Sequence, residues 1–124
     1  MLVLDTNTIL RYILLDDVEA AKLTEVRMAR EEILLPIEVV AEIVFVLLKV
    51  YFFDRKKIVQ CVSTMMKHKN VRIPHKGVVK TALNYFGETK LDFIDCLMVG
   101  YAVIEGHQIF SFDKKLNKIL SSLP

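Results

Sequence analysis

The chain has 124 residues, of which 53% are hydrophobic and 26% are charged, with 17 basic and 15 acidic side chains. A chain of this length can bury a sizeable core without disulfides or metals, so we expect one domain over residues 1–124. The composition excludes a disordered tail, a collagen-like rod and a linker. The mean hydropathy of +0.38 is high for a soluble domain and favours an apolar partner interface.

Short apolar segments alternate with longer helical patterns in the first half of the chain. In chain order we predict a strand at 2–4, a helix at 16–32, a strand at 33–35, a helix at 38–51 and a helix at 55–68. Pro36 ends the second strand and suits the start of the helix that follows. Asp54 is a typical N-cap residue for the next helix.

The same alternation continues in the second half. We predict a strand at 70–74, a helix at 76–86, a helix at 92–105, a strand at 108–112 and a helix at 114–120. Gly87 and Gly106 are expected to close the two longer helices. Strands that alternate with helices predict an α/β fold, in which a central, mostly parallel sheet is covered by helices on both faces.

Cysteine, histidine and apolar segments exclude several classes of protein. Cys61 and Cys96 lie far apart without metal-ligand spacing, so both are expected to be buried thiols in a reducing cytoplasm. The three histidines also lack ligand spacing and are expected on the surface or in loops. No signal peptide or membrane span is predicted, because Asp5 interrupts the apolar start and residues 33–53 carry several charges.

Two carboxylates follow predicted strands. Asp5 comes directly after the first strand, and Asp113 comes directly after the strand at 108–112. In parallel α/β folds the ligand crevice lies beyond the carboxyl ends of the strands. The sequence therefore predicts that Asp5 and Asp113 lie at one edge of the sheet.

Two further acids stand in apolar helical segments. Glu42 and Asp95 are each surrounded by aliphatic residues, and a buried carboxylate normally has a partner or a metal ion. The alternative is an exposed helix face or, for Asp95, a favourable charge in the first helical turn. Asp92 lies three residues before Asp95 on the same face, so it is a candidate both for the helix cap and for a metal site.

Clustered carboxylates without Cys or His ligands suit a hard divalent cation such as Mg²⁺ or Mn²⁺. Such an ion can activate water for phosphodiester hydrolysis and stabilise charge on the phosphorus. If four acids form the metal site, the rest of the chain carries 17 basic and 11 acidic residues. This excess of positive charge favours a polyanionic substrate, although lysine-rich helices are equally typical of a solvated surface.

Four segments resemble, in order and over nearly the whole chain, the motifs of PIN-domain proteins, and most closely the toxin ribonucleases of VapBC toxin–antitoxin pairs. The segments are LVLDTNTILRY (2–12), LPIEVVAE (35–42), LDFIDCL (91–97) and FSFDKKL (110–116). Each motif is weak alone, and their order and spacing make them specific together. The resemblance implies a PIN-like three-layer α/β/α fold.

The resemblance also implies a metal-dependent endoribonuclease in which Asp5, Glu42, Asp95 and Asp113 hold Mg²⁺ or Mn²⁺. Thr6 and Asn7 would then orient Asp5 or contact RNA, and Ser111 would support the fourth motif. Arg11 and Lys114 are the basic residues nearest to the acids in sequence, and hence candidates to hold the RNA backbone. Family members often form homodimers and are inhibited by a small antitoxin, so we expect both partners, in the cytoplasm.

Other functions remain to be weighed. A haloacid-dehalogenase-type phosphatase would need a second acid where Asn7 stands, and a receiver domain would need early paired acids closer to the first strand than Asp16 and Asp17. A PIN-like scaffold without catalysis is disfavoured because all four acids are present. An RNA-processing nuclease that is not a toxin stays open, since the motifs do not identify the RNA.

Overall fold

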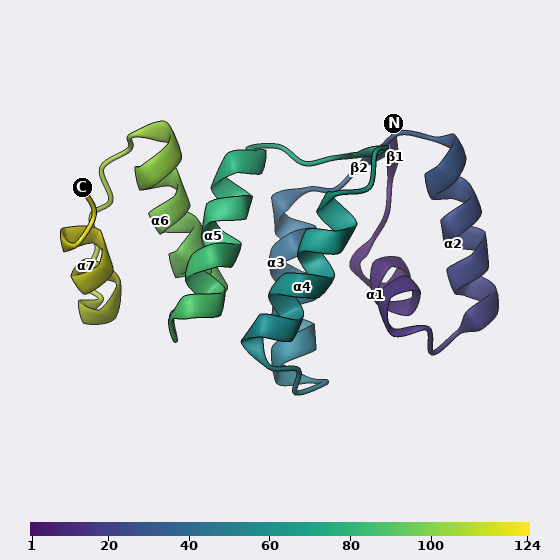
Figure 1. Cartoon of the computed structure of the whole chain (residues 1–124), viewed down its shortest axis with the longest axis horizontal. Helices are drawn as coiled ribbons and strands as arrows, with labels where there is room; N and C mark the ends of the chain where they lie inside the picture. The colour runs from purple at the N-terminus through teal and green to yellow at the C-terminus, as the bar shows by residue number, and fades with distance from the viewer. The chain divides into compact units, whose positions relative to one another are not determined.

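The computed structural model describes all 124 residues, which form two compact units, Met1–Pro74 and His75–Pro124 (Figure 1). The first unit contains β1 (Leu2–Val3), α1 (Thr6–Leu14), α2 (Val18–Arg30), β2 (Ile33–Leu34), α3 (Ile37–Lys49), α4 (Arg55–Met66) and β3 (Val71–Arg72). The second contains α5 (Lys76–Glu88), α6 (Phe93–Glu105) and α7 (Lys114–Ser121). The predicted α/β class is confirmed.

A small parallel sheet organises the first unit. The strand order is β1-β2-β3, with Leu2 opposite Ile33 and Ile33 opposite Val71. A pair of helices follows each of the first two strands, as parallel connections require. All three strands therefore end at the same edge of the sheet, and Asp5 follows the first of them by two residues.

Helix α1 was not predicted from the sequence. Asp5 begins it as N-cap, because its Oδ1 accepts a hydrogen bond of 2.8 Å from the Thr8 backbone N–H. Ile9 and Leu10 are buried, and apolar residues recur four positions later at Ile13 and Leu14. The segment thus has the apolar spacing of a helix. This pattern was missed because it directly follows the apolar residues of the short strand.

The predicted caps at Asp54 and Gly106 are confirmed. Asp54 Oδ1 accepts from the backbone N–H of Lys57 at 2.8 Å, at the start of α4. Gly106 ends α6 in the left-handed region, with φ of 70°. Gly87 does not close α5 as predicted. The helix continues to Glu88, and Thr89 caps it by donating its backbone N–H and its hydroxyl to the Tyr85 carbonyl.

The predicted strand at 108–112 is wrong, because these residues form an irregular segment between α6 and α7. Its sequence alternates in the manner of a strand. A strand, however, is stabilised by hydrogen bonds to a neighbouring strand, and the second unit contains only helices. The segment therefore lacks a partner within its own unit.

Helices α5 and α6 pack against each other and form the centre of the second unit. Val78, Val79, Ala82, Cys96 and Val99 are fully buried there. At one end of the pair, Glu105 Oε2 lies 2.5 Å from His75 Nδ1, and its Oε1 lies 3.4 Å from His107 Nε2. These contacts tie the start of α5 to the end of α6.

The expectations for cysteines and membrane segments have mixed outcomes. Both cysteines are free, as predicted, and Cys96 is buried. Cys61 is only half-buried, because it lines a cavity described below. None of the helices has the length and apolar character needed to cross a membrane.

The close approach of α5 and α6 at Gly100 predicts a large effect of a small substitution. A Cβ added at Gly100 would lie 2.5 Å from the Val78 carbonyl oxygen, which is backbone and cannot move alone. We expect Gly100→Ala to destabilise the protein by about 1–3 kcal/mol, as overpacked cores do.

Gly77→Ala is the matched control in the same unit. Its Cβ would meet the flexible Ile104 side chain at 3.2 Å, and alanine favours helix by roughly 1 kcal/mol. Urea denaturation should therefore show a clear loss for Gly100→Ala and a smaller loss or a gain for Gly77→Ala. Equal losses would contradict the backbone clash.

Candidate functional site

Three acids of the second unit are positioned by the starts of two helices. Asp92 occupies the N-cap position of α6, yet its side chain makes no capping hydrogen bond. Asp95 lies in the first turn of α6, three residues later, so the two share one face of the helix. Asp113 is the N-cap of α7 and accepts a hydrogen bond of 2.8 Å from the Leu116 backbone N–H.

Ser111 supports Asp113 directly. Its hydroxyl accepts a hydrogen bond of 3.0 Å from the Asp113 backbone N–H, and its carbonyl accepts one of 2.8 Å from Asn117 Nδ2. These two hydrogen bonds of Ser111 hold the irregular segment before α7 in place next to Asp113. The supporting role that the fourth motif implied for Ser111 stays a prediction.

The three acids line one cavity with a volume of about 330 Å³. Its remaining lining residues are Lys90, Leu91, Lys114 and Lys115. Lys114 was predicted near the site, whereas Lys115 was not assigned a role. The sequence contains a signal for two of these cavity lysines. Lys90 lies two residues before the candidate acid Asp92, and Lys115 lies two residues after the candidate acid Asp113.

Burial and the neighbouring acids both raise the pKa of Asp95. Its partly buried position raises the pKa of its carboxyl group, and the negative charges of Asp113 and then Asp92 raise it further. Like charges therefore lie close enough to repel one another in this cavity. A bound cation would relieve that repulsion.

In the first unit, Asp5 is exposed at the start of α1. Hydrogen bonds from the side chain and backbone of Thr8 hold the pKa of Asp5 below its usual value, with a smaller contribution from the charge of Arg11. Thr6 and Asn7 form the first turn of the same helix. Arg11 is engaged elsewhere, since its Nη1 lies 2.9 Å from Asp17 Oδ2 in a surface ion pair.

Glu42 lies on α3 and is exposed, so its apolar neighbours in sequence do not bury it. Val40, Ile43, Val44 and Leu47 face the core instead. The exposed-face alternative considered for Glu42 is therefore the observed one. Asp5 and Glu42 follow neighbouring parallel strands, β1 and β2, whose carboxyl ends share one edge of the sheet.

The donor chemistry of the cavity in the second unit fits Mg²⁺ or Mn²⁺. Its acidic groups are all carboxylates, the ligands that hard divalent cations prefer. Burial, followed by the charges of Asp113 and Asp92, raises the pKa of Asp95, and a cation bound here would offset those charges. No group of three or more His, Cys, Asp or Glu side chains is arranged to hold a metal ion by itself.

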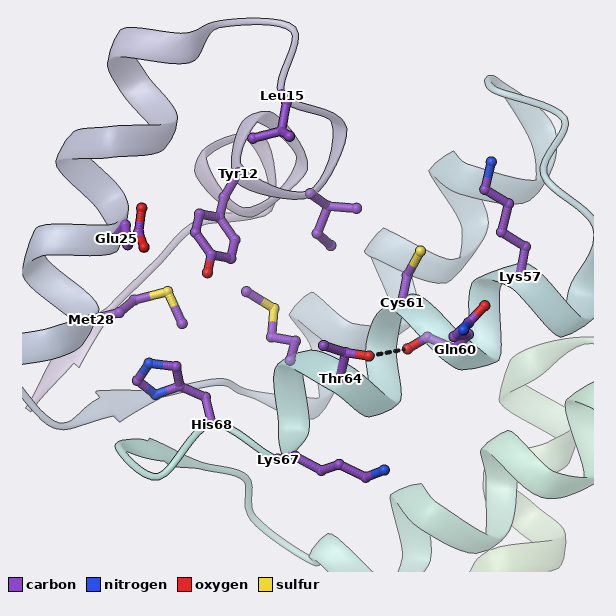
Figure 2. Close-up of a pocket in the computed structure, with 12 residues that line it drawn as sticks. Tyr12, Leu15, Glu25, Met28, Lys57, Gln60, Cys61, Thr64, Lys67 and His68 are labelled. Carbon is purple, nitrogen blue, oxygen red and sulfur yellow. Dashed lines mark hydrogen bonds between the residues drawn. The ribbon is translucent and has the colours of Figure 1, made fainter.

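A second and larger cavity, of about 700 Å³, lies in the first unit between α1, α2 and α4 (Figure 2). Tyr12 of α1, Met28 of α2 and Cys61 of α4 lie around the same space, and His68 closes it from below (Figure 2). Its surface is mostly apolar, with Glu25 and Lys67 among the charged residues that line it. The sequence did not predict this cavity, because its residues come from separate helices.

The amino-acid sequence matches a known family. The PIN domain family matches residues 2–120, which is nearly the whole chain, and the chain therefore belongs to it. PIN domains have a nuclease-type fold and generally use divalent metal ions. No match was found among curated proteins or among solved structures.

The raised pKa of Asp95 predicts how its substitution changes stability with pH. In EDTA at pH 7 the ionised Asp95 destabilises the folded chain, and Asp95→Asn removes that charge. We expect Asp95→Asn to raise Tm at pH 7. The gain should shrink as the pH falls and should be lost below 3.8, the ordinary pKa of the group, because the Asp95 carboxyl is then protonated in both the folded and the unfolded chain.

Glu105→Gln is the control, and its expected change in Tm at pH 7 has the opposite sign. A hydrogen bond from His75 lowers the pKa of Glu105, so its substitution should lower Tm at pH 7, and this loss should disappear at acid pH. Thermal unfolding by circular dichroism from pH 3.5 to 7.5 measures both. A pH-independent effect of Asp95→Asn would contradict charge repulsion in the cavity.

Proposed function

We propose that the chain is a metal-dependent endoribonuclease that hydrolyses RNA phosphodiester bonds. The observation that carries the proposal is the convergence of Asp92, Asp95 and Asp113 on one cavity, where burial and then the charges of the other two acids raise the pKa of Asp95. Asp95 and Asp113 belong to two different sequence motifs. Membership of the PIN family supplies the nuclease-type chemistry.

The acids that we propose as metal ligands are Asp95 and Asp113 of the second unit and Asp5 and Glu42 of the first, with Asp92 as an additional candidate. The family match spans both units, which supports a single domain over residues 1–124. The carboxylates would hold Mg²⁺ or Mn²⁺. When bound, the ion lowers the pKa of water and offsets charge on the phosphorus.

The protein residues have separate tasks in this proposal. The carboxylates orient a water molecule in line with the phosphorus–oxygen bond that breaks. The attacking oxygen bonds to phosphorus, its proton passes to solvent, and the leaving oxygen is released as a hydroxyl group. Ser111 positions Asp113 through the hydrogen bond to its backbone. Thr6 and Asn7 stand beside Asp5, where they can contact RNA.

Asp5→Asn should abolish metal-dependent cleavage of a labelled RNA pool, with a fall of more than about 100-fold, because a ligand charge is lost. Asparagine is as good an N-cap as aspartate, so α1 should remain folded. Gel electrophoresis of the products in Mn²⁺, Mg²⁺ and EDTA measures the effect. Asp54→Asn is the matched control, since Asp54 is also an exposed N-cap that bonds a backbone N–H three residues later.

The double variant tests whether the two units contribute to one site. Residues that act as a unit are strongly non-additive, so Asp5→Asn with Asp95→Asn should be no less active than either single variant. Equal activity of wild type and Asp5→Asn would mean that the cleavage is contamination. An absence of cleavage of any RNA would favour a scaffold domain, and cleavage confined to precursor RNA would favour a processing nuclease.

We further propose that the nuclease is the toxin of a cytoplasmic toxin–antitoxin pair and forms a homodimer. A mostly apolar cavity between three helices suits the apolar side of a partner helix. Exposed apolar residues on the same helices, among them Leu15 and Leu23, extend the apolar surface. The high mean hydropathy of the chain is consistent with such interfaces.

The antitoxin proposal predicts a partner whose binding depends on this cavity. Co-purification of the chain with the product of an adjacent small gene, followed by light scattering, gives the mass of each complex. Met28→Lys and Thr64→Lys would each place a charge at the cavity. Met28 is buried and Thr64 is exposed, so Thr64→Lys should weaken binding at least tenfold without unfolding the protein. Undiminished binding by both variants would contradict this site.

A further inference from the structure

The acidic cavity of the second unit is lined by as many cationic as anionic side chains. Lys90, Lys114 and Lys115 accompany the three aspartates, and Leu91 is the only apolar residue in the lining. The cavity is therefore electrically balanced before any ion binds. A divalent cation held by the carboxylates would leave it positive and would attract an anion.

Two of these lysines occupy electrostatically unfavourable positions. Lys114 and Lys115 are the first two residues of α7, whose first turn contains no acid. The N-terminal end of a helix carries partial positive charge, so lysines are disfavoured there and favoured at the other end. Lys118, in the last turn of the same short helix, has the favourable placement.

No internal ion pair offsets this cost. Neither Lys114 nor Lys115 forms an ion pair or another polar contact, although both line the same cavity as three carboxylates. Ion pairing with the aspartates therefore does not explain why Lys114 and Lys115 occupy these positions. Their ammonium groups remain able to bind an external anion at the mouth of the cavity.

We propose that Lys90, Lys114 and Lys115 form a clamp for the backbone phosphates of single-stranded RNA at this cavity. The inference rests on the proposed nuclease function and names the residues that hold its substrate. Lysine acts as a point charge on phosphate, so the clamp binds the backbone without reading the bases. Its three cations flank the acids that would act on the phosphodiester.

The clamp is tested by the salt dependence of RNA binding without turnover. The probe is a fluorescein-labelled single-stranded RNA of 20 nucleotides, bound to the Asp5→Asn chain in Mg²⁺ and measured by anisotropy over a range of KCl concentrations. Each phosphate contact contributes about 0.7 to the slope of log affinity against log salt. Replacing the three lysines with glutamine should lower that slope by about 2 and weaken binding at least tenfold at low salt.

Lys76, Lys80 and Lys118 provide the matched control. They are exposed lysines of the same unit that do not line the cavity, so their triple glutamine variant changes net charge equally. It should alter the slope little. Equal slopes for the two triple variants would overturn the clamp, because general charge would then explain binding.

The outcomes separate the clamp from the nuclease. If the wild type cleaves RNA and the clamp variant keeps the parental slope, the clamp is wrong and the nuclease proposal stands. If the wild type does not cleave RNA and the Asp5→Asn parent does not bind it, both are overturned. Circular dichroism of each variant establishes that the helices are intact, and removal of lysines from the start of α7 should not destabilise it.

Discussion

The candidate site depends on the placement of aspartates at helix N-termini. Asp5, Asp92 and Asp113 occupy the N-cap positions of α1, α6 and α7. The positive end of a helix favours an ionised carboxylate, and free backbone N–H groups there provide donors. The same residues that begin helices are thereby held at fixed points of the fold.

Asp95 is the acid of this cavity whose pKa is raised. It follows one of the N-cap residues by a single turn, so the geometry of α6 brings it close to Asp92, and α7 contributes Asp113 to the same cavity. The helix end alone would favour its ionised form. Burial and the two neighbouring charges prevail and raise its pKa instead.

Local signals in the sequence predicted much of the fold and the candidate acids. Asp54, Gly106 and the apolar strands act through neighbouring residues, and the structure confirms their roles. The prediction of a strand at 108–112 is wrong because a strand needs a neighbouring strand to hydrogen-bond to, and the sequence pattern of one segment does not reveal whether it has one. Lys115 was not predicted because a single lysine beside an acid is ordinary, and only the structure shows that it lines a cavity with three aspartates.

The capping and metal-binding roles of an aspartate are compatible because a carboxylate has two oxygens. Asp113 uses Oδ1 to cap α7, and Ser111 accepts from its backbone N–H, so both the chain and the side chain are oriented. No other hydrogen bond engages its side chain, which leaves Oδ2 for a ligand. A carboxylate that is already held in place loses little conformational entropy when a cation binds. The local rule that begins the helix therefore also prepares the acid for the proposed chemistry.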